Sequence, residues 1–109
     1  MYEQKPWLKF YGNVPHSIDY PRVTMYEALL QTAREKADAV AYDFMGHAST
    51  YRGFISEIDR CADALAALGL KQGDRITISM PTSPQGIIAF YAANKLGAVA
   101  SMIHPLSTA

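Results

Sequence analysis

The stretch GDRITISMPTSPQGIIAFYAANKLGAVASMI, residues 73–103, decides the fold of this chain. Within it, residues 75–80 alternate polar and apolar side chains, which predicts a strand with one apolar face. A helix follows, with Ser83 as its N-cap and Gly97 as its stop. Residues 98–103 are almost continuously apolar, which is typical of a strand covered on both faces. Strand, helix and strand within about 30 residues make a βαβ unit, so the two strands should be parallel.

A first helix is predicted to begin after Thr24. Thr24 and Glu27 fit a capping box, in which each side chain bonds a free backbone amide of the first turn. Apolar residues then recur along one helical face: Tyr26, Leu29, Leu30, Ala33 and Ala37.

A hairpin and a second helix should follow. Residues 39–44 predict a strand, residues 45–48 a turn, and residues 49–51 a short return strand at the edge of the fold. The second helix should start near Arg52 and stop at Gly69, which suits a left-handed C-terminal cap. Its expected apolar face comprises Phe54, Ile58, Cys61, Ala62, Leu65 and Leu68.

Residues 1–23 form an N-terminal arm without periodicity. Pro6, Pro15 and Pro21 should keep its backbone out of regular structure. Its aromatic residues include Trp7, Phe10, Tyr11 and Tyr20. An arm so rich in aromatic side chains is expected to lie against an apolar surface. The fold class is therefore α/β: a partly parallel sheet, flanking helices and a small edge hairpin, with residues 24–109 as the α/β portion.

The composition is that of a globular protein. Half of the 109 residues are hydrophobic and 18% are charged. Ten Lys and Arg balance ten Asp and Glu, so no basic excess exists to neutralise a nucleic-acid backbone. The single cysteine, Cys61, rules out an internal disulfide and a thiolate zinc site, and fits a reducing compartment. No signal peptide is expected, because the N-terminus carries Glu3, Lys5 and Pro6 and lacks an apolar stretch. No membrane span is expected either, since Asn94-Lys95 interrupt the apolar window 86–103. We therefore expect a cytoplasmic protein.

Few residues stand out as candidates for chemistry. His16, His47 and His104 are far apart in sequence, which predicts no metal site. His104 precedes Pro105 at the end of the last strand, where ligands of parallel sheets gather; a local hydrogen bond is the competing interpretation. Cys61 falls on an apolar helix face and should be a buried, inert thiol.

Two short motifs are interpreted as structural devices. In Gly73-Asp74-Arg75, Gly73 supplies a positive φ and Asp74 can accept a hydrogen bond from the turn backbone. Ser83-Pro84 could present free amides to an anion, but no Gly-rich run precedes it. Helix capping is therefore the expected role of Ser83.

Several short segments nevertheless occur in a telling order along the chain. They are Pro6-Trp7-Leu8, Thr50-Tyr51, Gly73-Asp74-Arg75, Lys95-Leu96-Gly97-Ala98 and Pro105-Leu106. This order resembles the N-terminal part of the adenylate-forming acyl-CoA synthetases, and most closely the bacterial long-chain fatty-acid–CoA ligases. Three positions depart from that pattern, because Thr82, Gln85 and His104 stand where the family usually has Asn, Glu and Asn.

The resemblance implies a two-step reaction in the full-length parent. A carboxylate attacks the α-phosphate of ATP, with magnesium, to give an acyl-adenylate and pyrophosphate; the thiol of coenzyme A (CoA) then displaces AMP. In that family a Ser/Thr/Gly-rich loop with a Lys holds the phosphates, and no position here matches it. The resemblance therefore assigns no catalytic, cofactor-binding or metal-binding residue to this chain, which should be an inactive N-terminal fragment that binds neither ATP, magnesium nor CoA.

The expected partners are the remainder of the parent enzyme and a second copy of the chain. Self-association is expected because an open strand edge and uncovered apolar surface attract another chain. The alternative is a stand-alone α/β binding or regulatory domain without catalysis, such as a flavodoxin-like receiver. Receivers gather acidic residues at strand ends to hold magnesium, whereas the strands here end in Met80-Pro81 and His104-Pro105, which disfavours that alternative.

Overall fold

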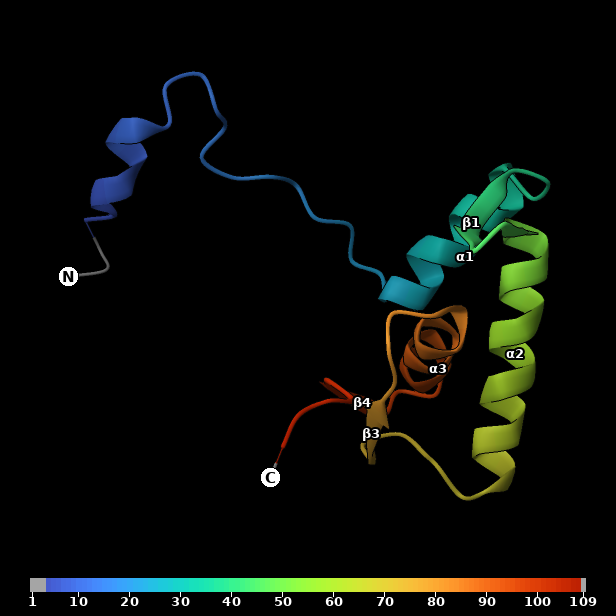
Figure 1. Ribbon diagram of the computed structural model, residues 1–109. Coiled ribbons are helices and arrows are strands. Elements are labelled where there is room, and N and C mark those ends of the chain that lie inside the picture. Colours follow the sequence, from blue (N-terminus) through green and yellow to red (C-terminus); the bar gives the residue numbers. More distant parts are fainter. Residues whose placement is uncertain (1–3, 109) are drawn as a thin grey trace.

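The computed structural model describes residues 4–108 and confirms an α/β fold (Figure 1). Its elements, in chain order, are the 3₁₀ helix η1 (Pro6–Phe10), α1 (Met25–Glu35), β1 (Val40–Phe44), β2 (His47–Thr50), α2 (Tyr51–Ala67), β3 (Arg75–Ser79), α3 (Pro84–Lys95) and β4 (Val99–Ile103). The strands form two separate pairs, β1 with β2 and β3 with β4. No helix within residues 4–108 has the length and apolar character needed to cross a membrane.

The predicted βαβ unit is present. β3 and β4 are parallel, in register from Arg75 opposite Val99 to Ser79 opposite Ile103, and α3 packs on both strands. The expectation that β4 is covered on both faces is wrong, because Val99 and Met102 are about half exposed. Among the described residues no other helix packs on this sheet as α3 does, so the opposite face of β4 stays open.

The core lies where α1, α2 and α3 meet. Its fully buried centre is Ile58, and Phe54 stacks edge-to-face with the rings of Tyr42 and Tyr91 at centroid distances of 5.3 and 5.8 Å. The other buried members of this cluster are Tyr26, Ala62 and Ala92. The predicted apolar face of α2 is therefore confirmed at its N-terminal two-thirds.

The C-terminal end of that face was predicted wrongly. Leu68 is 85% exposed, because it is the C-cap of α2 and lies beyond the last packed turn. Gly69 follows with φ +102°, which confirms the left-handed stop. The helix ends before Leu68 can reach the other two helices.

The helix starts follow the predicted caps. Thr24 Oγ1 accepts from the Glu27 amide at 3.1 Å and Glu27 Oε2 accepts from the Thr24 amide at 2.8 Å, which is a complete capping box. Thr50 caps α2 through the Gly53 amide at 3.1 Å. Because Thr50 is the cap, α2 begins at Tyr51, one residue earlier than predicted.

The hairpin turn is tighter than predicted. It consists of Met45 and Gly46 alone, with φ of +52° and +85°, and Asp43 Oδ1 accepts from the Gly46 amide at 3.1 Å. Two residues with positive φ match the twist of antiparallel strands, so β2 can begin at His47 instead of Ser49.

The N-terminal arm differs from expectation in two ways. Pro6 begins a 3₁₀ helix, because its fixed φ suits a first helical turn. The described part of the arm, residues 4–23, also runs away from the helices instead of lying against them (Figure 1). Phe10 and Tyr20 are both 79% exposed as a result.

Candidate functional site

The Gly73-Asp74 turn joins the starts of the two parallel strands. Gly73 has φ +84° and its amide donates to the Gly97 carbonyl at 3.0 Å, while the Val99 amide donates to the Asp74 carbonyl at 2.7 Å. Asp74 Oδ2 accepts from the Lys71 amide at 3.0 Å. The turn motif is thus engaged in holding backbone, as predicted.

Ser83 also has the predicted structural role. Its Oγ accepts from the Gly86 amide at 3.3 Å and caps α3, whose first residue is Pro84. The hydroxyl satisfies one of the amides that a helix start leaves free.

An apolar hollow of about 640 Å³ lies at the carboxyl ends of β3 and β4. This is the edge where ligands of parallel sheets bind. Its lining residues are Met80, Pro81, Thr82, Met102, Ile103, His104, Pro105 and Leu106, none of them carrying a formal charge when the histidine is neutral. We call it the strand-end hollow. Its surface is suited to apolar contact rather than to charge stabilisation.

His104 is the one nitrogen-bearing side chain in the lining of the strand-end hollow. Its Nδ1 accepts a hydrogen bond from the Leu106 amide at 3.1 Å, and its carbonyl accepts from the Ser107 amide at 3.0 Å. The interpretation as a loop histidine with a local hydrogen bond is confirmed. One ring nitrogen is therefore used by the turn that follows β4.

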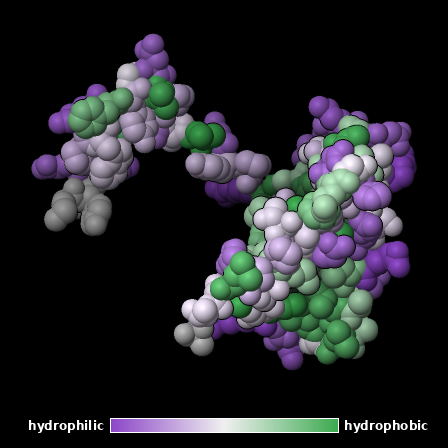
Figure 2. Space-filling model, viewed as in Figure 1, coloured by the Kyte–Doolittle hydropathy of each residue, from purple (hydrophilic) through white to green (hydrophobic). Residues whose placement is uncertain are grey.

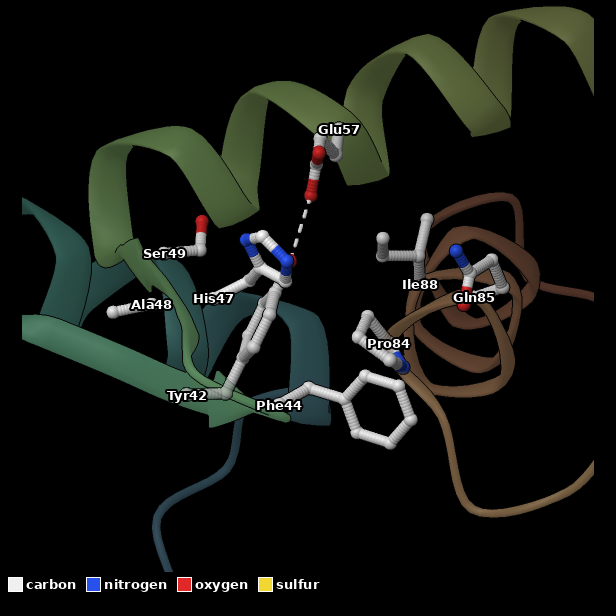
Figure 3. Close-up of a pocket in the computed structure, with 9 residues that line it drawn as sticks. All are labelled: Tyr42, Phe44, His47, Ala48, Ser49, Glu57, Pro84, Gln85 and Ile88. Carbon is white, nitrogen blue, oxygen red and sulfur yellow. Dashed lines mark hydrogen bonds between the residues drawn. The ribbon is translucent and has the colours of Figure 1, made fainter.

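A second hollow, of about 390 Å³, lies between the β1–β2 hairpin, α2 and the start of α3 (Figure 3). The Tyr42 hydroxyl donates to Glu57 Oε2 at 3.1 Å across it. Burial raises the pKa of the Tyr42 hydroxyl, Ser49 opposes this in part, and the Glu57 carboxylate raises the pKa further, so the phenol stays protonated. The remaining lining residues are Phe44, His47, Ala48, Ser49, Pro84, Gln85 and Ile88.

Sequence reasoning missed this hairpin hollow. Its walls come from three segments that are far apart in the chain, and no spacing rule connects Tyr42 with Glu57 or Pro84. The only local signal was His47, which the sequence placed in a turn. The structure puts His47 in the first position of β2, at the rim of the hollow.

The three histidines do not converge. His16 stacks edge-on against Tyr11 in the arm, His47 lies in the hairpin and His104 follows β4. Within residues 4–108, no three His, Cys, Asp or Glu side chains are grouped so that they could hold a metal ion.

A polar cluster links the three helices of the core. Asp59 Oδ1 accepts from the Tyr26 hydroxyl at 2.7 Å and from Lys95 Nζ at 2.8 Å. Burial alone would raise the pKa of the Asp59 carboxyl, but the hydrogen bonds from Lys95 and Tyr26 outweigh it and the pKa is lowered. The hydrogen bond to Asp59 in turn raises the pKa of Lys95. Both groups are therefore charged at neutral pH, which makes the cluster a structural tie.

Cys61 is half-buried rather than buried. It borders a shallow depression with Arg60 and Gln85, so one side of the thiol is open. Burial of the rest raises the pKa of the Cys61 thiol. A protonated thiol is a poor nucleophile, in keeping with the predicted inert role.

Comparison with known proteins places these elements in a family. Residues 29–109 match the family described as AMP-binding enzyme. A long-chain-fatty-acid–CoA ligase of Bacillus subtilis is 32% identical in an alignment 109 residues long, which covers 99% of this chain and 20% of that protein. The chain thus spans about a fifth of the length of this relative.

Solved structures agree with the sequence match. A fatty acyl CoA synthetase of Mycobacterium tuberculosis superposes with a TM-score of 0.72 and 36% identity, over 78% of this chain and 17% of that one. The N-terminal subdomain of NpsA from Klebsiella oxytoca superposes with a TM-score of 0.76 and 26% identity, over 78% of this chain and 22% of that one. With a family match over most of its length and this agreement in fold, the chain belongs to the AMP-binding enzymes.

Proposed function

We propose that this chain is the N-terminal portion of an acyl-CoA synthetase that joins a fatty acid to CoA at the expense of ATP. The observation that carries the proposal is the alignment with the B. subtilis ligase, which runs through 99% of this chain and includes the arm. The fold similarity to the M. tuberculosis synthetase supports it. In this proposal the chain functions in fatty-acid metabolism in the cytoplasm.

The part played by these residues in such an enzyme is architectural. The polar groups that the sequence singles out bond to the backbone. They are Gly73 and Asp74 in the strand-start turn, which belongs to the family pattern, and Ser83 in the α3 cap and His104 in the turn after β4, which do not. Transfer of an adenylyl group requires cationic and backbone donors aimed at the phosphates. We therefore propose that other residues of the parent bind ATP, magnesium and CoA, and that the 109-residue chain alone is inactive.

The proposed organisation has two parts, an arm of residues 1–23 and an α/β portion of residues 24–109. The proposed partners are the remainder of the parent enzyme and a second copy of this chain. Self-association is supported by the half-exposed apolar side chains of β4 and by the single neighbour that each strand of the β3–β4 pair has.

The first experiment is to sequence the reading frame beyond the Ala109 codon and to assay its product. With a fatty acid, ATP and CoA, the product should release pyrophosphate and form acyl-CoA, and omission of the fatty acid should abolish both. A stop codon directly after Ala109, or a longer product without fatty-acid-dependent pyrophosphate release, would contradict the synthetase proposal.

The inactivity of the isolated chain has a separate test. Calorimetric titration of the 109-residue chain with ATP and magnesium should show no saturable heat. Saturable binding at micromolar ATP would mean that the chain itself holds a nucleotide site.

A further inference from the structure

The hairpin hollow brings two aromatic rings and a carboxylate together. Tyr42 and Phe44 lie two residues apart on β1, so their side chains point to the same face of the hairpin. Figure 3 shows the Tyr42 ring rising toward Glu57 of α2 and the Phe44 ring extending toward Pro84 at the start of α3. The hollow therefore places a negative charge beside two aromatic rings.

These groups are held in position by the fold itself. The Tyr42 ring meets the buried ring of Phe54 edge-to-face at 5.3 Å, and its hydroxyl donates to Glu57 Oε2 at 3.1 Å. The ring contact fixes the aromatic wall, and the hydrogen bond orients the carboxylate. The second oxygen, Glu57 Oε1, accepts no hydrogen bond from the residues that the structure describes. A ligand can therefore bond to it without displacing a protein donor.

The charge of Glu57 has no counter-ion in the described part of the chain. The ion pairs within residues 4–108 are Arg52 with Asp38 and Lys95 with Asp59. Arg60, one turn further along α2, borders a neighbouring depression that Glu57 also lines, but the two side chains do not pair. The lining of the hairpin hollow contains no Lys or Arg, and Glu57 is its one formal charge when His47 is neutral. The hollow is therefore negative and attracts a cation.

The surroundings of the hairpin hollow differ from those of the strand-end hollow. Figure 2 shows hydrophilic groups interspersed with apolar ones on the upper part of the body, where the hairpin and the start of α2 lie in Figure 1. A larger apolar area covers the lower part of the body. The hairpin hollow is thus the better of these two for a ligand that is partly charged and partly apolar.

The other lining groups favour a guanidinium over an ammonium ion. A guanidinium group carries only donors, and the hollow offers acceptors in the Glu57 carboxylate, Ser49 Oγ and the Gln85 amide oxygen. A guanidinium is planar and weakly hydrated and stacks on aromatic rings, whereas an ammonium ion holds its water more strongly. Pro84 and Ile88 add apolar surface for a methylene stem.

We propose that the hairpin hollow binds an alkylguanidinium group. The cation lies against Glu57 beside the rings of Tyr42 and Phe44, and its methylene stem lies along Pro84 and Ile88. The hollow of about 390 Å³ is of the size of small-ligand sites, which span roughly 300–1,000 Å³. An exposed ion pair and an exposed cation–π contact each strengthen binding by only about two- to fivefold, so the affinity should be millimolar. This site is independent of the synthetase activity proposed above.

Nuclear magnetic resonance titration of the isotope-labelled 109-residue chain tests the site. The probe is N-butylguanidinium chloride, at constant ionic strength because salt screens exposed charges. It should shift the amide signals of Tyr42, Phe44 and Glu57 with a saturable, millimolar dependence. Butylammonium chloride, which keeps the charge but lacks the plane, should bind more weakly. N-butylurea, a neutral molecule of nearly the same shape, should give no saturable shift at these residues.

The ligand series uses the unaltered chain, so its outcome does not depend on how a variant folds. Equal shifts with butylurea would show that the charge of the ligand is irrelevant, and would overturn the proposal. The absence of saturable shifts with butylguanidinium, or shifts spread evenly along the chain, would overturn it as well.

Two variants assign the binding to the hollow. Glu57→Gln removes the charge at nearly constant size and should weaken butylguanidinium binding by about fivefold, while Phe44→Leu removes one ring and should weaken it by about twofold. The matched control is Asp63→Asn, an exposed residue of α2 outside the lining, which changes the net charge equally and should leave the affinity unchanged. Unchanged binding in Glu57→Gln, or an equal loss in Asp63→Asn, would overturn the proposed site.

A blocked arginine distinguishes two sources of the same chemistry. N-acetylarginine methylamide presents the guanidinium on a peptide backbone. Tighter binding of this compound than of butylguanidinium would support an arginine side chain of a polypeptide as the occupant. Weaker binding would support a small free guanidinium compound.

Discussion

Truncation of Ile58 tests whether the three-helix junction is the centre of stability. Ile58 is fully buried within the cluster that includes Tyr26, Phe54, Ala62 and Ala92. Ile58→Ala removes three carbon groups, and at about 0.8 kcal/mol for each the loss is roughly 2.4 kcal/mol. The cavity left between the helices adds to this, so we expect a cost of about 3 kcal/mol, within the usual range of about 2–5 kcal/mol.

Urea unfolding followed by far-ultraviolet circular dichroism measures this cost. Fluorescence is unsuitable because the one tryptophan, Trp7, lies in the arm, which runs away from the helices of the core (Figure 1). All variants are compared at one protein concentration, since association would shift apparent stability. The midpoint should fall at constant slope, and Ile58→Val should cost about 1 kcal/mol.

Leu68→Ala is the matched control on the same helix. Its side chain is 85% exposed, so the change should stay within about 0.5 kcal/mol. The packing argument fails if Leu68→Ala costs as much as Ile58→Ala, or if Ile58→Ala costs less than about 1 kcal/mol.

Three further predictions concern the backbone at two glycines, the charged pair Asp59 and Lys95, and the thiol of Cys61. Gly73→Ala should destabilise the fold by about 1–2 kcal/mol, because φ of Gly73 is +84° and an L-residue is strained there. Gly86→Ala should stabilise the fold by about 0.5 kcal/mol, since alanine favours a helix and its new Cβ meets the nearest atom at an ordinary 3.5 Å. Equal effects of the two substitutions in thermal unfolding would refute the role given to the positive φ of Gly73. Because the pKa of Asp59 is lowered in the folded state, Asp59 adds to the free energy of unfolding above pH 3.8, its ordinary pKa, and this gain is lost as the pH falls through the folded pKa. The free energies of unfolding of wild type and Asp59→Asn should therefore converge in acid. Because the pKa of Lys95 is raised in the folded state, the stability that Lys95 contributes is lost only in strong alkali. Asp59 and Lys95 are both partly exposed, so wild type and Asp59→Asn should differ in free energy of unfolding by less than about 1 kcal/mol at neutral pH. A difference between the two proteins that grows in acid would contradict this. Burial raises the pKa of Cys61, so iodoacetamide at pH 8 should modify it more slowly in the folded chain than in urea, and equal rates would show an open thiolate.

Much of the fold follows from local sequence. The capping box at Thr24, the cap at Ser83 and the stop at Gly69 each depend on residues within one helical turn, so the helices could be placed to within a residue or two. The alternation over 75–80 and the apolar run that follows α3 were sufficient for the parallel pair. These signals are local because the backbone groups that they satisfy are local.

Non-local features could not be predicted in the same way. The length of the hairpin turn depends on how β1 pairs with β2, and the exposure of β4 depends on how many layers cover it. The hairpin hollow joins Tyr42 to Glu57 across two elements, and the cluster at Asp59 joins three helices. Periodicity reports which face of an element is apolar, but not what packs on it.

For the candidate site, the sequence by itself determined that the family motifs hold backbone turns, because Gly73 and Asp74 act on their immediate neighbours. It also placed His104 at a strand end. Only the tertiary structure decided that His104 borders an apolar hollow and that the arm lies apart from the body. Both features depend on which segments distant in the chain pack together, and no local sequence pattern specifies that packing.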